Sequence, residues 1–339
     1  MDHACALQIV RQADGITTLS WPATLGIGPA TVFHGPDLAS IDFSKPAAVA
    51  ETECHIANAT LTSHFALRFA DGQQVHGATR HFALDGATNL RDAGGYATEE
   101  GRRVRWGRIF RSGHLSSLSP AAREDFAKLG IRTVCDFRLA TERAGEQAEI
   151  PGQPRLETLG VPPGKSDQHF FHRLFEETDD PARVAREIEA VLRLYVLDFA
   201  AQYRLMFDVL LDAGDSPVLL NCSAGKERTG VGVALLLLAL GVPAASARHE
   251  FLLSGRYFPA TRELPRVLRK YAVPSKDDAA LTPLVMPLLQ TPTGYADAVF
   301  GALDSAIRAH GSQARFFEVA YGLNAPRRAA LQEKFTLRD

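Results

Sequence analysis

The stretch Val218–Leu240 constrains the fold of this chain more than any other part. It starts with a short run of valine and leucine, passes through a loop that contains Gly225 and Gly230, and ends in an apolar segment without a polar face. This order indicates a buried strand, a tight loop and a helix buried on all sides. Such a loop brings backbone N–H groups and the positive end of a helix dipole to one point. The sequence therefore predicts an α/β fold with an anion-binding loop.

The loop carries a thiol and a guanidinium six positions apart, on Cys222 and Arg228. A helix N-terminus and a neighbouring arginine favour the thiolate, the reactive form of cysteine, and a planar guanidinium pairs with two phosphate oxygens at once. Cys222 is thus expected to attack phosphorus and form a cysteinyl-phosphate that water hydrolyses. The hydroxyl of Thr229 would stabilise the departing thiolate. The residues expected to bind phosphate are Ser223, Ala224, Gly225, Lys226, Glu227 and Arg228.

The decapeptide Asn221–Gly230 resembles the signature of protein tyrosine phosphatases of the Cys-x5-Arg type. It is most similar to His-Cys-x-Ala-Gly-Lys-Asp-Arg-Thr-Gly, the signature of a bacterial tyrosine/serine phosphatase branch. Three further segments resemble motifs of that branch, namely Asn89–Asp92, Phe110–Gly113 and Asp136–Arg138. In the first of them, Arg91 either faces the phosphate or stabilises a structural turn.

This resemblance runs from Leu84 to the C-terminus and implies a catalytic domain over residues 84–339. Its fold would be a central, mainly parallel sheet flanked by helices. The resemblance also implies a mobile helical lid over residues 256–292, for which two ordinary surface helices are the alternative. No cofactor or metal is implied.

Two positions depart from the branch signature. Asn221 replaces a histidine that favours the thiolate in the relatives. We therefore expect the thiolate of Cys222 to form less readily here, with activity that persists. Glu227 replaces an aspartate that is a candidate proton donor.

The proton donor for the leaving oxygen has to be found outside the usual Trp-Pro-Asp loop, because Trp21-Pro22 is followed by alanine. Glu227 is the first choice, since it lies in the phosphate loop and nearby phosphate charge favours its protonated form. Asp136 is the second choice, although holding Arg138 or the loop is the more expected role for it. Asp92 is the third.

Residues 1–83 differ from the rest of the chain. Short alternating segments separated by turn residues, such as Ile16–Trp21, predict a small all-β sandwich, and the surroundings of Trp21 resemble a fibronectin type III domain. Phe65–Phe69, the Asp71-Gly72 turn and a strand through Val75 predict a hairpin. No catalytic chemistry is evident in this region.

Composition excludes several classes of protein. A net charge of −2 argues against a broad nucleic-acid-binding surface, and the longest apolar run, Val231–Val242, is too short to span a membrane. Met1–Cys5 lacks the pattern of a signal peptide, so we expect a cytoplasmic protein. The four cysteines lack metal-ligand spacing. Among them, Cys135 is either a buried apolar residue or the partner of Cys222 in a protective disulfide.

The motifs together predict a phosphomonoesterase, with a phosphorylated protein or a phosphoinositide as its partner. Phosphotyrosine is the first expected substrate, and phosphoserine, phosphothreonine or phosphoinositides are further ones. A catalytically silent phosphate-binding module is one alternative. A sulfurtransferase of the rhodanese type is another, against which stand Arg228–Gly230 and the motif at Asn89–Asp92.

Overall fold

A nine-stranded mixed sheet organises the molecule. The computed structural model describes residues 6–147, 149–165 and 169–338, so the predictions on Met1–Cys5 lie outside the described residues. The strand order is β13-β12-β14-β11-β9-β8-β1-β2-β5. The first four strands run parallel to one another, and their bounds are Arg155–Thr158 for β13, Thr133–Asp136 for β12, Val218–Asn221 for β14 and Ile109–Ser112 for β11. The predicted α/β class is confirmed, and parallel pairing is concentrated around the strand that precedes the phosphate loop.

Helices cover both faces of this parallel part. Along β14, Leu219 packs on one face, while Val218 and Leu220 pack on the other, as expected from the alternation of side chains in a strand. Leu219 meets α2 (Pro120–Lys128). The opposite face meets α7 (Glu227–Ala239), whose residues from Arg228 to Ala239 are all buried, and around it pack α5 (Pro181–Leu197), α6 (Ala200–Asp212), α8 (Ala244–Leu252) and α12 (Thr293–Ala309). The predicted all-round burial of the helix after the loop is confirmed.

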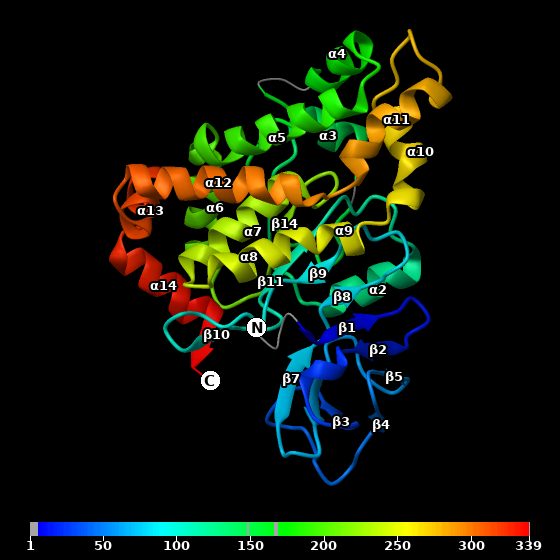
Figure 1. Ribbon diagram of the computed structural model, residues 1–339, viewed down its shortest axis with the longest axis vertical. Coiled ribbons are helices and arrows are strands. Elements are labelled where there is room, and N and C mark those ends of the chain that lie inside the picture. Colours follow the sequence, from blue (N-terminus) through cyan, green and yellow to red (C-terminus); the bar gives the residue numbers. More distant parts are fainter. Residues whose placement is uncertain (1–5, 148, 166–168, 339) are drawn as a thin grey trace.

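Shorter elements close the two ends of the helical layer (Figure 1). At one end lie α3 (Ala140–Gly145), α4 (Phe170–Glu177), α9 (Ser254–Tyr257), α10 (Ala260–Lys270) and α11 (Asp278–Leu289). At the other end lie α13 (Gln313–Tyr321), α14 (Ala325–Phe335) and the pair formed by β10 (Arg102–Val104) and β15 (Thr336–Arg338). In the described part of the chain, no helix has both the length and the apolar character needed to cross a bilayer.

The N-terminal strands form two layers around a small core of their own. The predicted hairpin is present as β6 (His64–Arg68) and β7 (Gln74–Ala78), which join β3 (Ala30–Gly35) and β4 (Ala48–Ala50) in an antiparallel sheet. The other layer consists of β1 (Gln8–Arg11), β2 (Thr17–Ser20) and β5 (Glu53–Ile56), and Trp21 and Phe65 lie in the core between the layers. The resemblance to a fibronectin type III domain is not confirmed.

The N-terminal layers are not separate from the catalytic sheet. Strand β1 pairs in parallel with β8 (His81–Phe82), and β8 pairs with β9 (Arg91–Asp92), which in turn pairs with β11. Backbone pairing therefore crosses the predicted boundary between residues 83 and 84, and that boundary stays a prediction.

Candidate active site

The phosphate loop lies between the end of β14 and the start of α7, at the carboxyl edge of the parallel strands. Cys222 is buried, and its Sγ accepts a hydrogen bond from the backbone N–H of Gly225 at 3.2 Å. Gly225 has a φ of +67°, and a Cβ at this position would lie 2.3 Å from the carbonyl carbon of Ser112. Only glycine fits both constraints, so the loop can curl its amides around the sulfur.

Arg228 is held in place by a carboxylate from α3. Its two terminal nitrogens donate to the two oxygens of Glu142 at 2.7 and 2.9 Å, and one of them also donates to the carbonyl of Val161 at 3.0 Å. Burial opposes ionisation of Glu142, but the charge and hydrogen bonds of Arg228, together with the charge of Lys270, outweigh it and lower the pKa of Glu142 to about 2. The pair is therefore charged, and the guanidinium plane is fixed beside the loop. Glu142 was not among the predicted site residues, although it lies only four residues after Arg138, the end of the motif Asp136–Arg138.

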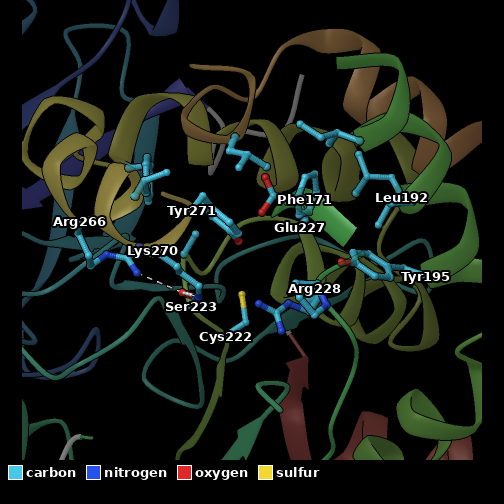
Figure 2. A pocket seen from close by; sticks show the side chains of 17 residues that line it. Phe171, Leu192, Tyr195, Cys222, Ser223, Glu227, Arg228, Arg266, Lys270 and Tyr271 are labelled. Carbon is cyan, nitrogen blue, oxygen red and sulfur yellow. Dashed lines mark hydrogen bonds between the residues drawn. The ribbon is translucent and has the colours of Figure 1, made fainter. Parts of the chain in front are cut away.

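A cavity opens above Cys222 and Arg228 (Figure 2). Figure 2 shows the Cys222 sulfur and the Glu227 carboxylate pointing into the same space. Much of the wall is apolar or aromatic, and it is built by α4, α5 and the residues flanking α10: Phe171, Ile188, Leu192, Tyr195, Phe258 and Tyr271. Such a wall accepts a planar apolar group above a reactive floor.

Among the three predicted proton donors, only Glu227 lines this cavity. Asp136 is fully buried and forms an ion pair at 2.8 Å with Arg138, whose backbone N–H it also accepts. Asp92 is buried too and accepts the backbone N–H groups of Gly94 and Gly107, and burial raises its pKa to about 7. The structure therefore does not bring Asp136 or Asp92 to the catalytic cavity.

Arg91 lies beneath the phosphate loop, away from the cavity. Its Nε donates to Glu250 at 2.8 Å, and the other oxygen of Glu250 accepts from Arg111 at 2.6 Å. Arg111 also donates to the carbonyl of Gly225, as does Asn89 at 2.8 Å. Burial, together with the charge of Arg111, lowers the pKa of Arg91 to about 10. These contacts make Arg91 a support of the loop. We call Asn89, Arg91, Arg111, Glu250 and Ser254, which accepts from both arginines, the inner network.

The side chain of Lys226 also points away from the expected phosphate position. Its ammonium donates to the carbonyls of Leu288 and Gln290 at 2.7 and 2.6 Å, and it lies 4.8 Å from the ring centroid of Phe258. It is also 3.3 Å from the carboxylate of Glu227. A residue of the phosphate loop thus holds the C-terminal end of α11. Its backbone remains in the loop, where phosphate binding was predicted.

Charged residues of α10 contact the loop from the other side. The hydroxyl of Ser223 accepts from Lys270 at 3.0 Å and from Arg266 at 3.3 Å. Arg266 in turn pairs with Glu146 on the segment after α3 and, at 2.6 Å, with Glu263. We call Glu146, Ser223, Lys226, Glu263, Arg266 and Lys270 the outer network. The charges at spacings of three and four along α10 were a signal that sequence reasoning did not use.

Three predicted positions are buried without a resolved role. The Oγ1 of Thr229 and the Oδ1 of Asn221 are buried, and neither has a hydrogen-bond partner among the described residues. Cys135 is a free thiol on β12, and burial raises its pKa to about 12. The structure therefore presents Cys135 as a buried apolar residue, without a disulfide to Cys222.

Comparisons relate this chain to known phosphatases. The family model described as the tyrosine phosphatase family matches residues 82–337. A protein named "Putative tyrosine-protein phosphatase" from Cupriavidus necator is 34% identical over 233 residues, which are 67% of this chain and 80% of that protein. The triple specificity protein phosphatase PtpB of Mycobacterium tuberculosis is 32% identical over 199 residues, covering 53% of this chain and 71% of its own. The crystal structure of P. aeruginosa TpbA covers 56% of this chain and 94% of its own, with 19% identity and a TM-score of 0.25.

Proposed function

Because this chain belongs to the tyrosine phosphatase family, we propose that it hydrolyses phosphotyrosine through a cysteinyl-phosphate on Cys222. The thiolate attacks phosphorus and the bond from phosphorus to the phenolic oxygen breaks. The loop amides and Arg228 stabilise the equatorial oxygens in the transition state. Glu227 gives its proton to the leaving phenolate. It then accepts a proton from the water that attacks the phosphocysteine and releases phosphate and the thiolate.

The observation that carries this proposal is the apolar and aromatic wall above Cys222 and Arg228. An aryl ring buries apolar surface against Phe171 and Tyr271 and leaves no polar group unsatisfied. An inositol ring would place its hydroxyl groups against the same side chains, and unpaired buried hydroxyls cost binding energy. Phosphotyrosine is therefore the first substrate. The name of the mycobacterial relative, a triple specificity phosphatase, makes phosphoserine, phosphothreonine and lipid phosphates the next candidates.

The two alternative functions, a catalytically silent phosphate-binding module and a rhodanese-type sulfurtransferase, are less well supported. A silent phosphate-binding module would need Arg228 and the loop amides but not the thiol of Cys222, which lines the cavity. The family match favours a phosphatase over a sulfurtransferase.

A phosphate-release panel tests the proposal. It compares peptides carrying phosphotyrosine, phosphoserine or phosphothreonine with phosphoinositides, and the Cys222→Ser protein serves as the blank. We expect the highest kcat/KM with phosphotyrosine. A higher value for any other class would overturn the substrate assignment, and turnover by the Cys222→Ser protein would overturn the nucleophile.

The role of Glu227 needs a separate comparison. Glu227→Gln should slow hydrolysis of an alkyl phosphate about 100-fold or more, because a poor leaving group needs its proton. Hydrolysis of an activated aryl phosphate should fall much less. If both substrates are slowed equally, Glu227 does not donate the proton.

A further inference from the structure

A second cleft adjoins the catalytic cavity and shares its cationic wall. Arg266 and Lys270 line both spaces. The rest of the cleft is lined by hydroxyl-bearing residues that follow β11, by α3 and by the start of α4. The cleft and the catalytic cavity therefore lie on either side of the same two side chains of α10.

The charges that line the cleft leave it electropositive. Its lining contains three cations, Arg266, Arg269 and Lys270, and two carboxylates, Glu142 and Glu146. Both carboxylates already have partners: Glu142 pairs with Arg228 and Lys270, and Glu146 pairs with Arg266. An incoming anion therefore meets carboxylates whose charge is balanced.

Arg269 is the cation that remains available. It lies on the exposed side of α10, and it makes no hydrogen bond or ion pair with any residue that the structure describes. His172 lines the same cleft, and its Nδ1 is buried without a hydrogen-bond partner among the described residues. The other ring nitrogen, Nε2, lies 3.0 Å from the carbonyl of Lys270 and therefore carries the proton. The exposed guanidinium of Arg269 can therefore pair with an anionic group, whereas the unprotonated Nδ1 of His172 can only accept a hydrogen bond.

We propose that this cleft binds an acidic side chain that neighbours the phosphotyrosine in a peptide substrate, with Arg269 as the residue that recognises it. The proposal rests on the proposed function, since it assigns a second contact to the same substrate. A peptide is favoured over a lipid headgroup because the reacting group has to fit the apolar wall of the catalytic cavity. The carboxylate of the neighbouring residue then pairs with the guanidinium in a fork geometry.

The test uses phosphotyrosine peptides of one alanine-rich sequence, in which Glu or Gln occupies each position from three before to three after the phosphotyrosine. Glu and Gln differ in charge but hardly in shape. We expect Glu to raise kcat/KM about three- to fivefold over Gln at one or more positions, the size typical of an exposed ion pair. The ratio should shrink towards one as salt is added.

Arg269→Gln should bring the Glu-to-Gln ratio to about one, and Arg308→Gln should keep it. Arg308 is an exposed arginine of α12 that lines neither space. A ratio near one in the wild type, or a raised ratio that survives in Arg269→Gln, would overturn the proposal. So would a loss, in Arg269→Gln, of activity on a water-soluble phosphatidylinositol bisphosphate but not of the peptide ratio, since this would assign the cleft to a headgroup.

Failure of the proposed function gives a different result. Turnover of the Gln peptides and of an aryl phosphate reports on catalysis alone. If the wild type turns over neither, binding of the Glu and Gln peptides to the Cys222→Ser protein, measured by fluorescence anisotropy, makes the same comparison. Equal affinities would then overturn the cleft proposal, and tighter binding of Glu that Arg269→Gln abolishes would support it.

Discussion

The inner and outer networks hold the same phosphate loop with the same kinds of residue, yet their surroundings differ. In the inner network, the side chains of Arg91, Arg111 and Glu250 are at most 1% exposed. In the outer network, Arg266 and Lys270 are 17% and 21% exposed, although Lys226 and Glu263 are buried. Removing one partner of a buried ion pair strongly lowers the stability of the fold, because the remaining charge is left without solvent. In a partly exposed pair, water solvates the remaining charge, so the loss of stability is small. The inner network is therefore expected to contribute more to stability than the ion pairs of Arg266 and Lys270 in the outer network.

The largest effect should come from the inner network. Glu250→Gln removes the carboxylate between Arg91 and Arg111 and leaves two buried guanidinium groups without a counter-charge. Breaking a buried pair in this way typically costs about 3–5 kcal/mol, so the free energy of unfolding, measured by urea titration, should fall by that amount.

The matched control is Glu333→Gln. Its carboxylate pairs with Arg102, but its side chain is 80% exposed, so we expect a change of about 1 kcal/mol or less. Similar losses for Glu250→Gln and Glu333→Gln would show that burial does not distinguish the inner network.

The next effect concerns catalysis. Glu142→Gln keeps the shape of the side chain but removes the charge that holds the Arg228 guanidinium. A small misplacement of a catalytic group costs about 100-fold in rate, and we expect kcat/KM for an aryl phosphate to fall about 10- to 100-fold. In the proposed mechanism Arg228 acts on the transition state, so most of the loss should appear in kcat. A change confined to KM would show that Arg228 does not depend on Glu142 for its position.

The pH dependence of the pair between Glu142 and Arg228 follows from the direction in which the pKa of Glu142 is shifted. Against the effect of burial, Arg228 and Lys270 together depress the pKa of Glu142 to about 2 in the folded protein, from an ordinary value of about 4.3. The contribution of the pair is therefore complete above pH 4.3 and is lost as the pH falls through about 2. The ratio of kcat/KM between wild type and Glu142→Gln should stay constant from pH 7 to about 4. A ratio that already declines between pH 6 and 5 would contradict a charged, depressed Glu142.

The comparison between the two networks also shows what the sequence could predict. The stretch Val218–Leu240 folds as expected, because its strand, loop and helix are determined by neighbours within a few residues. The positions of Cys222 and Arg228 follow from the same local geometry. The hairpin β6–β7 follows from alternation and its Asp-Gly turn.

Contacts between distant segments could not be predicted in this way. Arg91 and Arg266 are both arginines near charged neighbours in the sequence. Their local sequence does not predict that Arg91 pairs with Glu250 or that Arg266 pairs with Glu146. The direction of Lys226 depends on the carbonyl of Leu288 near the end of α11, 62 residues later along the chain. The pairing of β1 with β8 likewise depends on a partner that the alternation of β1 does not specify.

The smallest effect should come from the contact that ties α11 to the loop. Lys226→Met keeps the length and apolar character of the side chain but removes the two hydrogen bonds to the carbonyls of Leu288 and Gln290. Losing them should favour local opening by about 1 kcal/mol, so hydrogen exchange over residues 278–290 should become about fivefold faster, while exchange in β9 and β11 should not change.

Lys276→Met is the matched control, because its ammonium pairs with Asp179, whose side chain is 90% exposed. It should leave exchange near Gln290 as in the wild type. Equal exchange in the wild type and Lys226→Met would mean that packing of α11 on α5 holds α11 in place by itself. Faster exchange in β9 and β11 would mean that the outer contact also maintains the inner network, and the two sides of the loop would then form a single unit.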